Sequence, residues 1–596
     1  MKRLGRLESI ATAVLLFAAC TGSPGGGDEG DGDEDGPGGQ GGSGGTNGGG
    51  SGNGPPEPLP TPPAANSLER NPIEPLSCNK SLFEDPESSP LERLTREQYL
   101  NTMRDLFAGL VDAGSLPKKT DIPDPPREGS FSNNVFAQLG SESETNAWEA
   151  AAFKISTEAV KDLPKLMGCN PDGNTGCVDT FIDDFGMRAW RRPLSGGEKD
   201  ALKGLYQEAR ASLDVKGSVA TVLGAMLSSP QFLFRVQEGA GDVEEGQKKR
   251  LSGYEMASRL SYFLWNSMPD AELFAAAKDG KLSSEAQVEA AARRMLEDDR
   301  SKDTIRLLQK EWLHLERLEV RSTASQKSDE VYPSFNEKTE VALREGLQAY
   351  LDHTFWDGDH SLKNFYTSTK GWVNDDSADI YGVGKPGSGN LTEVDLDASK
   401  RKGFLTQPQV MSGYGSQVAQ SAILRGAFIM ESVLCAPSQP PPMNVVREFI
   451  EVPDRNAVTL RQVVEMTVEQ GTCAGCHKVI DGFGFLFENY DGIGAYQTKE
   501  RDLDIDASNE VVATLDLNGK YKNGIEFTEA LSKSEQAADC AVRQFYTFAV
   551  GRPQLENDGC FIAPLADEFI KGGTNMKDLL VNIAKSQAYR YRSAAK

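Results

Sequence analysis

Apolar residues recur at helical spacing through most of the chain. After the capping box Thr95-Arg96-Glu97-Gln98, apolar side chains follow at positions 99, 103, 106, 107 and 110, the one-sided pattern of an amphipathic helix. A second capping box, Ser252 to Glu255, opens a similar pattern that runs to Leu264. The same spacing predicts further helices at 180–192, 198–212, 216–228, 284–298, 302–318, 337–353, 421–434, 457–469, 536–550 and 576–587.

Patterns typical of strands are few and short. The best lies at Asn509–Leu517, beside an Asn518-Gly519 turn. The chain is therefore predicted to be mainly α, with a multidomain helical body and small β elements.

The first residues have the pattern of an export signal. Basic residues at positions 2, 3 and 6 precede the apolar run Ile10–Ala19, which is too short to span a bilayer but suits a signal-peptide core. The run ends in Phe17-Ala18-Ala19-Cys20, which resembles a bacterial lipoprotein processing site with Phe17 where Leu is usual. On this interpretation residues 1–20 are a lipoprotein signal peptide, and lipidated Cys20 anchors the protein to a membrane, facing the periplasm or the cell surface. Ordinary secretion with cleavage nearby is the alternative.

The next segment, 21–68, is rich in Gly, Asp and Pro and has too few apolar residues to bury a core. We predict that it is a disordered tether. About 530 residues remain, which at roughly 100 to 200 residues per domain implies three to five structural units.

The net charge of the chain argues against a nucleic-acid-binding function. The formal charge is −25 at pH 7, and no basic patch is evident that would attract nucleic acid, so no nucleic-acid partner is expected. An acidic surface suits a protein dissolved in the periplasm or outside the cell.

Cys473-Ala474-Gly475-Cys476-His477 is the most specific chemical motif in the chain. C-x-x-C-H is the sequence at which a c-type haem is attached. Two cysteines at this spacing can both form thioethers with the haem vinyl groups, while His477 provides the proximal iron ligand. A redox dithiol or half of a zinc site is the alternative, but the chain has neither a βαβ context nor a second C-x-x-C. The expected cofactor is therefore haem c, bound by Cys473, Cys476 and His477.

The sixth iron ligand is less defined. Met411 and Met466 are weak candidates, since methionine is the usual ligand in electron-transfer cytochromes. The remaining histidines, His314, His353 and His360, lie far upstream and are taken as ordinary helix or surface residues. An open iron position, which would permit peroxide or small-ligand chemistry, is the alternative.

Three further groups of residues each have two interpretations. Aromatic residues after the motif can wall a haem or fill an ordinary core: Phe483, Phe485, Phe487, Tyr490 and Tyr496. Three arginines can pair with haem propionates or form salt bridges between domains: Arg188, Arg191 and Arg192. Acidic residues can bind calcium or form a solvated edge: Glu488, Asp491, Asp502, Asp504 and Asp506.

Cysteine usage agrees with export. The chain has nine cysteines, and without Cys20 and the motif pair an even number remains, which in an oxidising compartment indicates disulfides. Turn residues between Cys169 and Cys177 predict that these two pair. The remaining pairings predicted, on weaker grounds, are Cys540–Cys560 and, by subtraction, Cys78–Cys435.

Breaks rich in Pro and Gly place the predicted domain boundaries. After the tether we predict a helical domain at 69–140, a second at 141–240, a third at 248–380, a cytochrome-c-like segment with the C-x-x-C-H motif at 395–500, and a C-terminal helical domain at 505–596.

Several motifs together resemble those of a known family. They are Arg188–Leu194, Ser229–Arg235, Tyr254–Trp265, Gly403–Thr406, Leu424–Gly426, Pro440–Val445, Ile480–Phe485, Glu488–Gly494 and Tyr546–Arg552. The chain resembles, over about residues 90 to 593, an exported, planctomycete-type, cytochrome-c-like family built from consecutive domains of unknown function. The resemblance implies a shared domain order with a haem segment towards the C-terminus, and no established reaction. The chain departs from the family in having no histidine shortly before the C-x-x-C-H motif.

These observations predict a membrane-tethered monohaem c-type cytochrome-like lipoprotein that transfers electrons in the periplasm or outside the cell, with an unknown redox partner protein. Two alternatives stay open: a haem oxidoreductase or peroxidase-like enzyme with an open iron site, and a non-enzymatic surface binding or scaffold lipoprotein.

Overall fold

The computed structural model describes most of the chain after residue 90. The described residues are 91–123, 131–138, 140–171, 176–240, 248–318, 326–437, 457–468, 474–555 and 558–593. The predicted signal peptide, tether and lipidation site, together with Cys78 and Cys473, lie outside them. None of the described helices is long and apolar enough to cross a membrane.

Both predicted capping boxes start helices. In the first, Thr95 Oγ1 accepts a hydrogen bond from the Gln98 amide and Gln98 Oε1 accepts one from the Thr95 amide, each at 3.1 Å. The second is built in the same way by Ser252 and Glu255. Each box satisfies amide groups that a helix N-terminus would otherwise leave unpaired, which explains why these two boundaries were predicted correctly.

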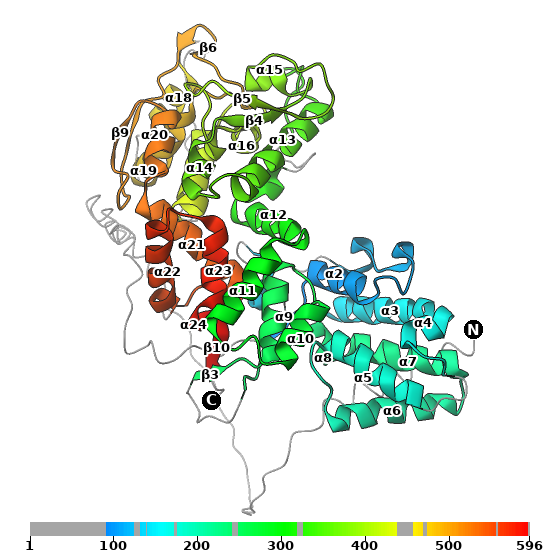
Figure 1. The fold of residues 1–596 in the computed structure, drawn as a ribbon. Coiled ribbons are helices and arrows are strands. Elements are labelled where there is room, and N and C mark those ends of the chain that lie inside the picture. The colour runs from blue at the N-terminus through cyan, green and yellow to red at the C-terminus, as the bar shows by residue number, and fades with distance from the viewer. Residues whose placement is uncertain are drawn as a thin grey trace, which may run out of the picture. The chain divides into compact units, whose positions relative to one another are not determined.

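A helical bundle forms the N-terminal part of the described chain. Its helices are α2 (Arg96–Leu106), α3 (Glu142–Ala159), α4 (Leu163–Met167), α5 (Gly176–Trp190), α6 (Gly196–Arg210), α7 (Val215–Ser228) and α8 (Pro230–Leu233). Helix α7 packs against both α3 and α6, and these helices lie side by side in Figure 1. The buried Tyr99 ring joins α2 to α3 and α8, 4.3 Å from Trp148 and 5.9 Å from Phe232 between ring centroids.

Helices also dominate the rest of the chain. The central ones are α9 (Gly253–Leu264), α10 (Ala271–Lys278), α11 (Glu285–Leu296), α12 (Arg300–Trp312), α13 (Glu337–Trp356), α14 (Leu362–Thr367) and α15 (Ala378–Tyr381). The later ones are α16 (Pro408–Gly413), α17 (Ala422–Phe428), α18 (Leu460–Val468), α19 (Ala474–Gly484), α20 (Gly524–Leu531), α21 (Glu535–Val550), α22 (Gly559–Lys571), α23 (Met576–Lys585) and α24 (Gln587–Arg590).

Short turns of other helix types connect these elements. The 3₁₀ turns are η2 (Ala113–Ser115), η3 (Lys119–Asp121), η4 (Val135–Ala137), η5 (Val160–Asp162), η6 (Leu315–Leu318), η7 (Phe404–Thr406) and η10 (Phe485–Phe487). One π-helical turn, η8 (Ile429–Val433), continues α17. The protein is therefore mainly α, as predicted.

The strands form only two-stranded antiparallel sheets among the described residues. The pairs are β1 (Glu92–Arg93) with β2 (Phe234–Arg235), β3 (Lys248–Arg250) with β10 (Tyr591–Ser593), β4 (Lys370–Val373) with β5 (Thr392–Asp395), β6 (Lys499–Glu500) with β7 (Leu503–Asp504), and β8 (Asn509–Val511) with β9 (Gly519–Tyr521). The predicted strand at 509–517 is shorter than expected, because the chain turns after Val511 and returns as β9.

One apolar core joins most of the helices from α9 onward, while Ile380 and Tyr381 of α15 belong to a second, smaller cluster. Trp312 at the end of α12 shows how it joins distant segments, since its ring packs 5.9 Å from Phe365 and 5.6 Å from Phe545 between centroids. Its indole Nε1 donates to the Ser432 carbonyl at 2.8 Å. Segments far apart in sequence are thus buried together, which is the main source of stability for short helices such as α14 and α16.

The disulfides confirm one predicted pairing and correct the others. Cys169 is bonded to Cys177 across the expected turn, but Cys435 is bonded to Cys540. The predicted Cys540–Cys560 and Cys78–Cys435 pairs are therefore wrong. Turn η8, which ends just before Cys435, packs against α21 and brings the two Cα atoms within 5.3 Å. Cys560 is also disulfide-bonded, and these disulfides are consistent with an exported protein.

The three arginines of the Arg188–Leu194 motif bind backbone carbonyls and a glutamate in the first turn of a helix. Arg191 is buried and donates to the carbonyls of Gln231, Phe232 and Phe234 at 2.9 to 3.0 Å. Arg188 donates to the Leu106 carbonyl at 3.0 Å, and Arg192 forms an ion pair with Glu198 at 2.7 Å. Their contacts are thus mainly with backbone carbonyls, and the one salt bridge is local.

The Arg192–Glu198 pair predicts a pH-dependent contribution to stability. Hydrogen bonding from Arg192 lowers the pKa of Glu198 to about 2. A carboxyl whose pKa is depressed on folding stabilises the protein above its unfolded pKa of about 4.3, and this contribution is lost as the pH falls towards 2. Glu198→Gln is therefore expected to lower the free energy of unfolding by about 1 kcal/mol at pH 7, since the pair is partly exposed. Urea unfolding at pH 7 and near pH 2 checks this, and an equal loss at both pH values would contradict it.

Candidate functional site around Cys476 and His477

The first turn of α19 presents the described part of the C-x-x-C-H motif. Cys476 and His477 are both half-buried at this end of the helix, while Cys473 lies outside the described residues. Cys476 is a free thiol, whereas the other cysteines among the described residues are in disulfides. The motif cysteine therefore differs chemically from the structural cysteines, because only a free thiol can form a thioether with a haem vinyl group.

The His477 imidazole is held by a carboxylate on its own helix. Its Nδ1 lies 3.0 Å from Asp481 Oδ2, one helical turn along α19. This hydrogen bond raises the pKa of His477 above its ordinary value, against the effect of burial. With the proton held on Nδ1, Nε2 is the ring nitrogen that can accept a metal, as in the carboxylate–histidine pairs of many metal sites.

Asp481 was not predicted as a site residue. Its side chain is 3% exposed, and its second oxygen, Oδ1, is buried without a hydrogen-bond partner among the described residues. A buried carboxylate with so few partners binds the imidazole proton strongly, because water does not compete for it. The sequence does contain a pattern that indicates this pair, because Asp481 follows His477 by four residues, the spacing at which side chains on a helix meet.

Two glycines allow α17 and α19 to cross in backbone contact. A Cβ atom on Gly426 would overlap the carbonyl oxygen of Ile480, and one on Gly484 would overlap the carbonyl oxygen of Ala422. The two helices are antiparallel, because Ala422 at the start of α17 meets Gly484 at the end of α19, whereas Gly426 further along α17 meets the earlier residue Ile480. This crossing fixes α19, and with it His477, against the core.

Arg425, next to Gly426, fixes the segment that follows α19. Its guanidinium donates at 2.8 to 3.1 Å to four backbone carbonyls, those of Met411, Phe487, Tyr490 and Asp491. Burial lowers the pKa of Arg425 to about 10, so it stays protonated at neutral pH. The arginine therefore replaces the solvation of a buried turn with fixed hydrogen bonds.

The acidic residues do not gather into a calcium site. Glu488 is 2% exposed and accepts a hydrogen bond from Gln420 Nε2 at 3.1 Å, while Asp491 Oδ1 accepts from the amides of Ile493 and Ala495. Asp504 lies on the surface, with 88% of its side chain exposed. Within the described ranges, no cluster of three or more His, Cys, Asp or Glu side chains could hold a metal ion.

The aromatic residues after the motif fill the core. Phe483 and Phe487 pack against Phe527, at 5.7 and 6.5 Å between ring centroids, and Tyr490 packs against Tyr496 at 5.7 Å. Phe485 lies under the guanidinium of Arg461, 4.7 Å from the ring centroid. The interpretation of these rings as core therefore has direct contacts to support it.

The two candidate sixth ligands differ in burial. Met411 on α16 is 1% exposed and belongs to the main core. Met466 is half-buried on α18, a helix that Arg461 anchors by donating to the carbonyls of Asp506 and Ser508 at 2.9 and 2.6 Å. Along the described part of α18, no side chain is fully buried.

The comparisons with known proteins find matches only to family models. Five models, each described as a protein of unknown function, match in succession: DUF1587 at 92–161, DUF1595 at 177–237, DUF1592 at 251–383, DUF1588 at 401–500 and DUF1585 at 519–589. The C-x-x-C-H motif and α19 fall within the DUF1588 segment. The chain matches no curated protein and no solved structure. It thus contains the five consecutive domains of unknown function that characterise the planctomycete-type multi-domain family.

Proposed function

We propose that the protein is a monohaem c-type cytochrome, anchored to a membrane through lipidated Cys20, that exchanges electrons with a redox partner protein in the periplasm or at the cell surface. The observation that carries the proposal is the pairing of the free Cys476 thiol with a neighbouring histidine whose Nδ1 is bound by buried Asp481. The export signal in the sequence and the disulfides support the compartment in which such a haem is attached.

The residues around the motif fit a haem. Cys473 and Cys476 would form the two thioethers, and His477 would provide the proximal nitrogen through Nε2. When bound, haem c supplies a one-electron iron couple. The chain's own contribution is orientation, because Asp481 holds the proton on His477 Nδ1 and the glycine crossing fixes the helix.

Several apolar side chains of α18 and α19 are only partly covered by protein. Val463 and Met466 on α18, and Val479 and Ile480 on α19, are only half-buried. A flat apolar cofactor that covered such side chains would gain about 25 cal/mol per Å² of apolar surface removed from water. The difference in burial supports Met466 over Met411 as the sixth ligand within this proposal.

A visible spectrum and an intact mass test the proposal directly. The full chain is to be exported from a host that matures c-type cytochromes, purified and denatured before mass measurement. A Soret band with haem mass that survives denaturation is the expected result, and colourless protein at apoprotein mass would overturn it. Carbon monoxide binding to the ferrous protein then separates a closed electron-transfer iron from the open site of a peroxidase-like enzyme.

Asp481→Asn tests the role of the carboxylate as a positioning residue. A carboxylate on Nδ1 makes the imidazole a stronger donor, which favours ferric iron. The variant is therefore expected to keep its covalent haem and to have a reduction potential higher by tens of millivolts. For a one-electron couple, each tenfold weakening of the stabilisation of ferric over ferrous iron raises the potential by about 59 mV. Redox titration measures this, with Asp504→Asn on the exposed strand β7 as control. An unchanged potential would show that Asp481 does not tune the iron.

A further inference from the structure

A large cleft lies away from the C-x-x-C-H motif, where three of the matched segments meet. Its volume is about 870 Å³, within the range of sites that hold small-molecule ligands. Helix α2 of the DUF1587 segment forms one side, and α12 and α13 of the DUF1592 segment form the others. Gln409 on α16 adds a side chain from the DUF1588 segment. Junctions between domains are common places for ligand sites.

The cleft has an apolar base and a polar rim. Of the leucines that line it, Leu307 on α12 and Leu315 in η6 are half-buried and offer apolar surface, whereas Leu347 and Leu351 on α13 are almost fully buried. Most of the other lining residues are charged or amide side chains, among them Asn101 and Gln348. A ligand in this cleft would therefore meet apolar surface on one side and many hydrogen-bonding groups on the other.

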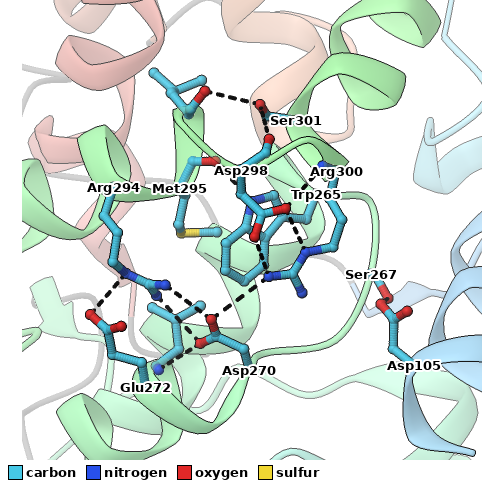
Figure 2. Close-up of polar contacts among 12 residues, drawn as sticks. Asp105, Trp265, Ser267, Asp270, Glu272, Arg294, Met295, Asp298, Arg300 and Ser301 are labelled. Carbon is cyan, nitrogen blue, oxygen red and sulfur yellow. Dashed lines mark hydrogen bonds and ion pairs between the residues drawn. The ribbon is translucent and has the colours of Figure 1, made fainter. Parts of the chain in front are cut away.

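Ion pairs hold the polar wall in place (Figure 2). The Arg300 guanidinium lies 3.5 Å from the centroid of the Trp265 ring and pairs with Asp298 at 2.7 Å. Asp270 links the two arginines, since its carboxylate lies 3.0 Å from the Arg294 guanidinium and 3.7 Å from that of Arg300. These contacts fix Arg300 and Trp265, the two members of this network that line the cleft, so this part of the wall is organised before any ligand arrives.

Two hydrogen bonds join α2 to the segment that follows α9, at the edge of the cleft. Ser267, just after α9, donates to Asp105 Oδ2 on α2 at 2.6 Å, as Figure 2 shows. Asn101 Nδ2 donates to the Asn266 carbonyl at 3.1 Å. The DUF1587 and DUF1592 segments are therefore tied together at the edge of the cleft.

The charges of the lining residues identify the class of ligand. Basic and acidic side chains line the cleft in nearly equal numbers, and many of them pair with each other or with acids close behind, as Arg306 does with Asp352 at 2.7 Å. Strong selection for an anion or a cation would need an excess of one sign. Hydroxyl groups both donate and accept hydrogen bonds, so a polyhydroxylated ligand satisfies both signs. We propose that this cleft binds a neutral oligosaccharide, with its C–H faces on the leucine base and its hydroxyls on the charged rim.

Calorimetric titration of the full exported chain with neutral hexasaccharides tests this proposal. The panel contains the hexamers of cellulose, xylan, mannan, amylose and laminarin, with hexagalacturonate as an anionic comparison. Saturable binding of at least one neutral hexamer is expected, with an affinity that changes less than about twofold between low and high salt. The double variant Arg344→Ala/Glu345→Ala removes two exposed rim residues of opposite charge and should weaken binding about tenfold or more.

The controls separate the cleft from the rest of the surface. Asp567→Ala/Lys571→Ala removes an exposed ion pair on α22 and, like the rim variant, leaves the net charge unchanged. Its affinity for the hexamer should stay within twofold of that of the wild type. Gln348→Trp, which fills the cleft from α13, should weaken binding as the rim variant does. Three outcomes would each overturn the proposal. They are binding of hexagalacturonate alone, binding that the rim and filling variants leave unchanged, and no binding of any neutral hexamer. The titration needs no haem, so its outcome is independent of the proposed function.

Discussion

Replacing Cys473 and Cys476 together by serine is expected to abolish covalent haem attachment. In the proposed cytochrome, two thioethers would keep haem on the chain after denaturation, and serine cannot form them. The variant should therefore show no Soret band and no haem mass after denaturation, while wild-type protein exported from the same host shows both. The expected effect is complete loss rather than a reduction, because no other free thiol is present among the described residues.

The control for this variant removes a different pair of cysteines. Cys169→Ser/Cys177→Ser breaks a disulfide in the N-terminal bundle and leaves the motif intact. Its haem content per chain should equal that of the wild type, although its stability should fall by about 2 to 4 kcal/mol. Haem retained on the Cys473/Cys476 variant would show that the motif is not the attachment site.

Gly426→Ala is expected to destabilise the protein by about 3 to 5 kcal/mol. The added methyl group would overlap the carbonyl oxygen of Ile480, and a backbone carbonyl cannot rotate away as a side chain can. The α17–α19 crossing would have to open, at a cost above that of ordinary overpacking in a core. Urea or thermal unfolding of the purified variant measures the loss.

Gly204→Ala is the matched control for the glycine variant. Gly204 also lies within a helix, α6, but a Cβ atom there would meet nothing within 4 Å. Its replacement should stabilise the protein by up to about 1 kcal/mol, since alanine is the better helix former. A Gly426→Ala protein as stable as the wild type would show that the two helices are not in backbone contact.

Helices are easiest to predict from sequence where the start and the apolar stripe are both local. The capping boxes at Thr95 and Ser252 each satisfy their own amides within four residues, so their sequence alone identifies the start of the helix. Helix α22 was not predicted, because it contains Pro564 and so does not read as a continuous helix. Helix α3 was not predicted because most of its buried positions are small or polar residues rather than large apolar ones.

The residues of the candidate site also divide into those that a local sequence pattern identifies and those that it does not. The C-x-x-C-H motif and the spacing of Asp481 from His477 are local patterns that the sequence displays. The role of Arg425 is not local, since its acceptors are backbone carbonyls on two distant segments and no residue type marks a carbonyl. The Cys435–Cys540 disulfide likewise depends on the packing of η8 against α21, which no pairing rule contains.

Three of the four carbonyls bound by Arg425 belong to the chain after α19 and tie it to α17, just as the glycine crossing ties α19 itself. Backbone held in this way has little freedom to relax when the charge at a neighbouring iron changes. For the proposed cytochrome, this means that the protein would contribute little to the reorganisation energy of electron transfer, because its dipoles are fixed before the electron arrives. A rigid frame of this kind would keep exchange with a partner fast even when the difference in potential between the two proteins is small.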